Sequence, residues 1–285
     1  MNLKGWLPDI PDYRDYSPAT ESVRTLLRSV SADEPDSSEL PVSVDLREWC
    51  SEIENQESIG SCTAHAGVGL IEFFQRKAFG KHIDASRLFL YKVTRNLLGW
   101  EGDTGAFLRD TMKAMVLFGV PPEQYWGYDI SQYDVEPSAF CYAFAQSYQT
   151  IKYYRLDPPG TSRDELMEQI WWHLACGLPV MFGFTVYSSI RQANSSGEIP
   201  FPSSIDTRQG GHAVMAVGYD DEKVIQNRSN GSTTTGALLI RNSWGTGWGD
   251  EGYGWLPYEY IHRGLAVDWW SLIDSEWVDT GEFGR

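Results

Sequence analysis

Long apolar runs are missing from this sequence of 285 residues, and none approaches the roughly 18 apolar residues of a membrane-spanning helix. Residues 1–10 contain one lysine and are interrupted by proline and aspartate, so they lack the apolar core of a secretion signal. Cysteine is scarce as well, because four in a chain of this length are too few for a disulfide scaffold. We therefore expect no transmembrane segment and a reducing, cytoplasmic setting.

Basic residues are also few, since 23 Lys and Arg stand against 39 Asp and Glu and give a net charge of −16. A field of this sign repels phosphate backbones, so nucleic acid is not expected as a partner. The simplest interpretation is a solvated acidic surface, and a preference for basic substrates is the alternative. Aromatic residues, in contrast, are abundant at 14%, with 12 Trp, which predicts broad packed faces and an aromatic-lined cleft.

The first 40 residues differ from the rest of the chain. They begin with GWLPDIPDYRDYSP, which is rich in Pro, Asp and aromatic residues, and a short helix is expected over residues 21–29. The acidic run SADEPDSSEL at 31–40 is typical of an exposed linker. We therefore predict an amino-terminal arm and linker over residues 1–40.

The remainder changes character near its middle. Apolar residues at helical spacing predict helices over 61–79, 86–98, 107–118 and 163–176. Short segments rich in β-branched and aromatic residues then predict strands within 179–187, 212–220, 236–244 and 252–261. This order predicts an α+β fold with a mainly helical part (41–160), a mainly β part (161–285) and a cleft between them.

Cys62 is the leading candidate for a nucleophile. It lies at the expected first turn of the helix over 61–79, where the helix dipole stabilises a thiolate. The small residues before it, in the string GSC, leave room for a substrate carbonyl. For Cys50, Cys141 and Cys176, which have no such context, we expect small buried side chains instead.

A base for this thiol is expected at His212, which opens the apolar run AVMAVGY at the start of a predicted strand. Asn242 follows another predicted strand, and its amide oxygen is suited to accept a hydrogen bond from the imidazole, with Trp244 shielding that bond. The backbone N–H of Cys62 and the side-chain amide of Gln56 are the candidate donors to an oxyanion.

Three segments together resemble the papain family of cysteine peptidases, the cathepsin type. They are NQESIGSC, ending at Cys62; GGHAVMAVGY, with His212; and RNSWGTGWGDEGY, with Asn242. The order Cys, His, Asn and the 150 residues from Cys62 to His212 agree with that family. The resemblance covers roughly residues 41–275 and implies a two-lobed fold, with a helical left lobe and an antiparallel β-sheet or barrel as right lobe.

The chain departs from the family pattern at three positions near the expected site. Ile59 stands where the family usually has a disulfide-forming cysteine, Thr63 replaces an aromatic residue, and Gly211 precedes the base in place of a more typical Asp or Asn. None of these removes a catalytic group. They indicate a divergent, prokaryotic-style member whose substrate preferences differ from those of better-known relatives.

The resemblance also implies residues that bind substrate. The loop with Gly102, Asp103 and Gly105 lies where the family binds the substrate backbone, and Gly211 is expected on the opposite wall. Asp103 and Arg109 have a second interpretation as a local clamp of that loop, and both stay open. Trp244 is the last of the candidate substrate-binding residues.

The function implied is hydrolysis of peptide bonds through a Cys62 thioester, without a cofactor or metal. His65, one turn after Cys62, forms a Cys-x-x-His pair, but no second pair accompanies it, so a core histidine is expected. The alternatives are an inactive peptide-binding scaffold and acyl transfer to amines. Expected partners are a peptide or protein substrate and the chain's own amino-terminal segment as inhibitor, with Trp6, Pro8 or Tyr13 near the cleft.

Overall fold

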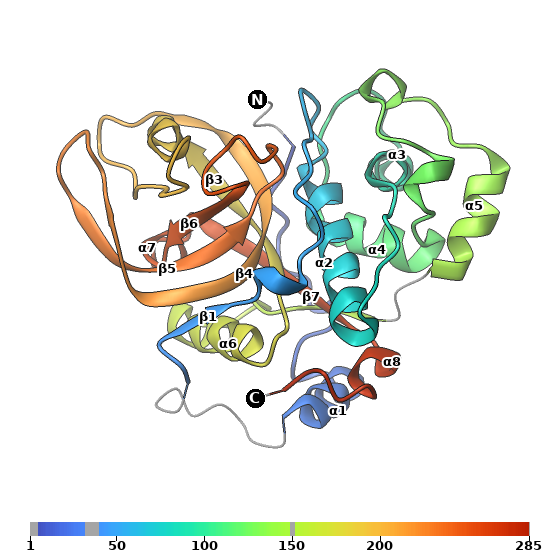
Figure 1. Cartoon of the computed structure of the whole chain (residues 1–285), viewed down its shortest axis with the longest axis horizontal. Coiled ribbons are helices and arrows are strands. Elements are labelled where there is room, and N and C mark those ends of the chain that lie inside the picture. Colours follow the sequence, from blue (N-terminus) through green and yellow to red (C-terminus); the bar gives the residue numbers. More distant parts are fainter. Residues whose placement is uncertain (1–4, 32–39, 149–151, 285) are drawn as a thin grey trace.

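The computed structural model describes residues 5–31, 40–148 and 152–284. It combines helices on one side with an antiparallel sheet on the other (Figure 1). The α-helices are α1 (Glu21–Val30), α2 (Cys62–Phe79), α3 (Arg87–Leu98), α4 (Leu108–Phe118), α5 (Ala139–Ala145), α6 (Arg163–Ala175), α7 (Glu259–His262) and α8 (Ser275–Val278). The strands are β1 (Ser43–Asp45), β2 (Lys152–Arg155), β3 (Val180–Tyr187), β4 (Arg208–Gln226), β5 (Thr233–Arg241), β6 (Tyr253–Pro257) and β7 (Ala266–Ile273). Short 3₁₀ turns span Arg47–Trp49, Glu123–Tyr125, Ile130–Gln132, Gln146–Tyr148 and Ser188–Ala193.

The central helix is α2, which begins at Cys62 as the sequence predicts. Its first thirteen residues are all buried, because β4 packs on one side of it and α3 and α4 on the other. It ends where Gly80 adopts φ of 67°, a left-handed conformation that glycine reaches without a steric cost. Burial on all sides fixes the direction of the helix and hence the position of its first residue.

The other three predicted helices of the main body are also confirmed, as α3, α4 and α6. At the start of α6 the Ser162 side chain accepts from the backbone of Glu165, and the Glu165 carboxylate accepts from the backbone of Ser162. This is the capping box that the spacing of the two residues indicates.

The sheet has the strand order β2-β7-β3-β4-β5-β6, and β1 pairs with β4 beside this path. Every pairing is antiparallel. The predicted strands are present as β3, β4, β5 and β6, whereas β1, β2 and β7 were not predicted. Among the described strands the sheet stays open, so the mixed helix and antiparallel sheet are as expected but no closed barrel forms.

The amino-terminal part of the chain crosses the whole molecule. From residue 5 the ribbon, in dark blue, runs between the sheet and the helices and continues to α1 beside α8 (Figure 1). The helix expected over 21–29 is α1, and it buries Val23, Leu27 and Val30 against the body. The predicted linker over 31–40 lies almost wholly outside the described residues.

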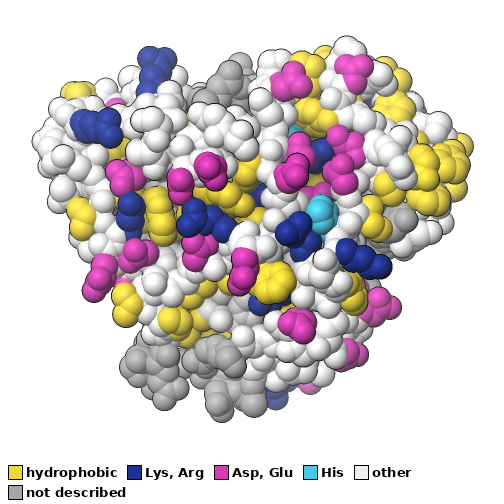
Figure 2. All heavy atoms as spheres, in the orientation of Figure 1, with side chains coloured by type: hydrophobic (Ala, Val, Ile, Leu, Met, Phe, Trp, Pro, Cys, Tyr) yellow, Lys and Arg dark blue, Asp and Glu magenta, His cyan; other side chains and the backbone are white. Residues whose placement is uncertain are grey.

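Acidic side chains are spread among basic ones on the face shown in Figure 2, and they form no single patch there. No helix within the described ranges is long and apolar enough to cross a membrane.

Candidate active site

The Cys62 thiol is fully buried at the start of α2. Its Sγ accepts a hydrogen bond from the backbone N–H of Ala213 at 3.4 Å, which places it beside the neighbouring residue of β4, His212. Burial raises the pKa of this thiol to about 12, while the backbone N–H groups of Ala213 and Thr63 act in the opposite direction. In this covered state the thiol is protonated at neutral pH.

The imidazole of His212 is held by one hydrogen bond and two ring contacts, one of them with the ring of Phe184, whose centroid lies 5.9 Å away at 72° between planes. Its Nε2 lies 2.7 Å from Oδ1 of Asn242, and Trp244 stacks on the ring with 4.5 Å between centroids and 24° between planes. Burial lowers the pKa of His212 to about 4, and the bond to Asn242 acts in the opposite direction. Its Nδ1 is buried and has no hydrogen-bond partner among the described residues.

Gln56 is brought to the same place by pairing between two segments that are far apart in the sequence. Its backbone N–H donates to the carbonyl of Ser243, whose Oγ donates to Gln56 Oε1 at 2.7 Å. Gln56 Nε2 donates to the carbonyl of Ile59 at 3.0 Å. The two side-chain bonds orient the amide and leave its second N–H available beside the start of α2.

The loop with Gly102, Asp103 and Gly105 lies against this helix start. Asp103 Oδ1 accepts from the backbone N–H of Gly60 at 2.7 Å and from the hydroxyl of Tyr91 at 2.6 Å. Gly105 donates its N–H to the same tyrosine hydroxyl, at 3.1 Å. These bonds favour the interpretation of Asp103 as a local clamp of the loop.

The amino-terminal arm fills the space above the thiol. The carbonyl of Gly5 accepts from the backbone N–H of Ala106 at 2.9 Å, and Leu7 donates to the carbonyl of Ala106 at 3.1 Å. Trp6 and Ala106 thus form a parallel bridge. A β-carbon built on Gly5 would lie 2.6 Å from Cys62 Sγ, so only a glycine fits at this point of the arm.

Trp6 lies on the sheet, and its side chain is 4% exposed. β-carbons built on Gly183 and Gly211 would lie 1.9 Å and 2.7 Å from its indole ring, so the two glycines make the space that the ring occupies. The indole Nε1 donates to Oδ2 of Asp268 on β7 at 3.1 Å. Gly211 therefore lies against the arm, through the indole and the backbone of Trp6.

Arg109 on α4 holds the next part of the arm. Its Nε and Nη2 donate to the two carboxylate oxygens of Asp15 at 2.8 Å and 2.7 Å, and its Nη1 pairs with Asp9. Arg109 thus clamps the arm and not the glycine loop. Tyr13 projects into solvent, with 88% exposed, and Pro8 is exposed as well, so of these three arm residues Trp6 is the one that is buried.

Sequence reasoning missed Asp268 and its neighbours Arg155 and Asp157. The guanidinium of Arg155 lies 3.1 Å from Asp268 Oδ1 and 2.8 Å from Asp157 Oδ1. One signal was present, since Asp268 is the single charged residue in the apolar run AVDWWSLI. No local pattern in the sequence indicates that Asp268 lies beside Trp6, which is 262 residues away in the chain.

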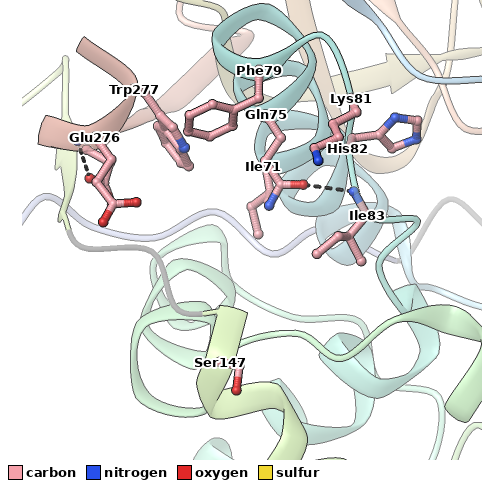
Figure 3. Close-up of a pocket in the computed structure, with 10 residues that line it drawn as sticks. Ile71, Gln75, Phe79, Lys81, His82, Ile83, Ser147, Glu276 and Trp277 are labelled. Carbon is pink, nitrogen blue, oxygen red and sulfur yellow. Dashed lines mark hydrogen bonds between the residues drawn. The ribbon is translucent and has the colours of Figure 1, made fainter. Parts of the chain in front are cut away.

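A pocket of about 430 Å³ lies between α2 and α8, away from the thiol (Figure 3). Phe79 of α2 points toward Trp277 of α8, whereas Gln75 Oε1 accepts a hydrogen bond from the backbone N–H of Ile83 at 2.9 Å. Gln75 is thirteen residues after Cys62 on one helix, which corresponds to about 20 Å along its axis. This pocket is therefore separate from the Cys62 thiol, against which Gly5 of the arm lies.

Residues 40–266 match the model of the papain family of cysteine proteases. The chain belongs to this family. It is accordingly a cysteine-type peptidase, a hydrolase that acts on peptides or proteins.

Individual relatives agree with this assignment. An uncharacterized peptidase C1-like protein of Acanthamoeba polyphaga mimivirus is 34% identical over 80% of this chain and 71% of its own length. Cathepsin S of Bos taurus is 27% identical over 79% of this chain, which spans 62% of that protein's length. The crystal structure of xylellain, a cysteine protease from Xylella fastidiosa, superposes with a TM-score of 0.74 and 36% identity over 95% of both chains.

Proposed function

We propose that Cys62 is the nucleophile of this peptidase, that His212 is its general base and that Asn242 orients the base. The observation that carries the proposal is the 2.7 Å bond between His212 and Asn242 beside the Cys62 thiol. Asn242 holds Nε2, so Nδ1 is the nitrogen left to take a proton. Trp244 covers the ring and keeps water from competing for that bond.

The reaction follows from these positions. The Cys62 proton passes to His212 Nδ1 as Sγ attacks the carbonyl carbon of the peptide bond. The oxyanion accepts hydrogen bonds from the backbone N–H of Cys62 and from Gln56 Nε2. The amine leaves with the proton from His212, and water then hydrolyses the thioester to regenerate the thiol.

This assignment predicts that Cys62→Ala lowers cleavage of casein or a general peptide substrate by at least about 10⁴-fold, because the covalent route is lost. Cys141→Ala is the matched control, since Cys141 is buried on α5, away from this site, and should keep its activity. Cleavage by Cys62→Ala at the wild-type rate would contradict the assignment of the nucleophile.

The second part of the proposal is that the arm inhibits the enzyme. Gly5 covers the thiol, Trp6 fills the adjacent pocket and Arg109 clamps the carboxylates that follow. Burial holds Cys62 and His212 in their neutral forms, whereas attack requires the thiolate, and Gly5 of the arm is part of what covers the thiol. The closed arrangement is therefore inactive, and displacement of the arm opens the cleft.

We propose that the glycines of the 102–105 loop and Gly211 border the path of a substrate backbone, because the arm already pairs with Ala106 beside them. An open pocket of about 350 Å³, lined by Leu7, Trp100 and Thr104 among others, continues this path beside the arm. A substrate that replaces the arm would then form backbone bonds with Ala106 of the same kind.

The inactive-scaffold and acyl-transfer alternatives differ from hydrolysis in their products. The paired His212 and Asn242 favour an active enzyme, and product analysis with added amines distinguishes transfer from hydrolysis. Boundaries at 40/41 and 160/161 remain our proposal for the domains. So does a cytoplasmic setting, which the scarcity of cysteine supports.

A further inference from the structure

The pocket that holds Trp6 lies beside the Cys62 thiol. Gly5 contacts the thiol, and the next residue of the arm places its side chain between Gly183 and Gly211. Any extended chain that replaces the arm has a side chain within a residue or two of the thiol that faces the same pocket. The pocket is therefore in position to select substrates next to the bond that is cleaved.

Asp268 forms the floor of this pocket. The fold holds its carboxylate there although burial of a charge and a left-handed backbone are both unfavourable in free energy. The side chain is fully buried, and the backbone has φ of 66°, a left-handed conformation that only a few per cent of non-glycine residues adopt. The pairing of β3 with β7 shifts register here, because Met181 pairs with Trp270 whereas Gly183 pairs with Val267. Such a bulge turns a side chain away from the direction that regular alternation gives it.

The two carboxylate oxygens of Asp268 have different partners. Oδ1 accepts from the indole of Trp270 at 2.8 Å and lies 3.1 Å from the guanidinium of Arg155. Oδ2 accepts from Trp6, and this is its sole hydrogen bond within the described residues. When the arm leaves, Oδ2 therefore loses its donor while Oδ1 keeps both partners.

We propose that Asp268 is a specificity-determining residue that selects substrates with an indole, or another flat side chain that donates an N–H, in the pocket vacated by Trp6. This inference rests on the proposed function, in which the arm occupies the substrate cleft. A buried acceptor without a donor is costly, so a side chain lacking the N–H is rejected more strongly than its shape alone requires.

A flat neutral donor fits this pocket better than a cationic side chain does. Arg155 already pairs with Asp268, so its positive charge lies next to any group that reaches Oδ2. The guanidinium of Arg109, over the ring of Trp270 at 5.6 Å, adds a second positive charge nearby. Asp157, Asp9 and Asp15 pair with these two arginines, and Asp110 lies beside Arg109 on α4; Asp9 and Asp15 leave with the arm.

The test uses pairs of fluorogenic peptides that differ at one residue, Trp in one and 3-benzothienylalanine in the other. The second side chain has nearly the same shape but carries sulfur in place of the N–H. The residue is placed in turn at the four positions nearest the cleaved bond. The quantity measured is the ratio of kcat/KM within each pair, in which the fraction of enzyme with an open arm cancels.

For the wild-type full chain we expect one position at which Trp is preferred by about tenfold to a hundredfold, the range of a hydrogen bond to a charged acceptor. In Asp268→Gly, which accepts the left-handed backbone, the ratio should fall close to one. Asp274→Asn is the matched control, because Asp274 is a buried carboxylate just after the end of the same strand, and it should keep the wild-type ratio. If the glycine variant does not fold, Asp268→Asn is tested in its place.

Equal rates for the two peptides at every position would overturn the inference, and so would a preference for Arg over Trp in the pocket. Binding of the same peptides to the double variant Cys62→Ala, Trp6→Ala, measured by calorimetry, does not depend on turnover. A Kd at least about tenfold weaker for the benzothienyl peptide supports the inference even if no peptide is cleaved, and equal Kd values reject it. Absence of cleavage with this binding preference intact would count against the proposed function alone.

Discussion

Replacement of Trp6 by Ala is the sharpest test of inhibition by the arm, because this one side chain carries much of the contact between arm and cleft. It removes the indole from between Gly183 and Gly211 and leaves Asp268 Oδ2 without its donor. Truncation of the whole arm is a poorer test, because α1 buries three apolar side chains against the body and its removal would expose that surface.

The size of the effect follows from the burial of Trp6. A buried Trp removes about 150–250 Å² from water, worth about 4–6 kcal/mol at about 25 cal/mol per Å². The bond to the Asp268 carboxylate adds about 1.5–3 kcal/mol. Water enters the vacated pocket and offsets part of this loss, so we take about 3 kcal/mol as a lower bound. The ratio of open to closed enzyme then rises by at least about 100-fold.

The assay is turnover of a short fluorogenic peptide well below KM, together with the rate at which an epoxide reagent labels Cys62. Both should rise in Trp6→Ala, up to the limit at which nearly all enzyme is open. Tyr13→Ala is the matched control, because Tyr13 is an aromatic residue of the same arm but is 88% exposed, so neither rate should change.

Equal turnover and labelling in Trp6→Ala and wild type, with the same thermal stability, would refute the reasoning. It would mean that the arm does not limit access to the thiol. A rise in Tyr13→Ala as large as that in Trp6→Ala would refute it too, because the effect would then not depend on the pocket.

Two further predictions concern the arm. Burial lowers the pKa of His212 to about 4 and raises that of Cys62 to about 12, and because Gly5 and Trp6 of the arm cover this place we expect opening to return both toward their ordinary values. The open form therefore binds a proton more readily between about pH 6.5 and 4, and loses one more readily above about pH 9, so the arm should be held most firmly near neutral pH. Hydrogen exchange of the Leu7 amide, corrected for intrinsic rates, measures this, and protection that increases steadily toward pH 4 would contradict it. Arg109→Ala should raise turnover about tenfold, because the two carboxylates of the arm lose a partly buried partner. The exposed pair of Arg24 with Glu21 gives the control Arg24→Ala, and an equal rise there would count against the clamp.

The parts of the fold and site that the sequence predicted depend on local patterns. The helix from Cys62, the strand with His212 and the end of the strand before Asn242 each show in a short string of residues. Glycine stops and helix caps are local as well, so α2 and α6 were predicted almost to the residue.

The parts that were missed depend on contacts between distant segments. Strand β1 has three residues and β2 has four, which is too short for a pattern, and each exists through a partner far along the chain. Asp268 gains its significance from a bulge in β7 and from Trp6 at the opposite end of the sequence. A hydrophobic pattern contains neither kind of information.

Attachment of the arm to the enzyme has a consequence for how this peptidase responds to concentration. A separate inhibitor dissociates on dilution, but the arm is tethered through α1, so its effective concentration at the cleft is fixed by the chain. Dilution of the enzyme should therefore leave its specific activity unchanged. A substrate then competes for the cleft with an arm whose effective concentration does not change. An abundant substrate that fits the Trp6 pocket would displace the arm and then be cleaved by the opened enzyme.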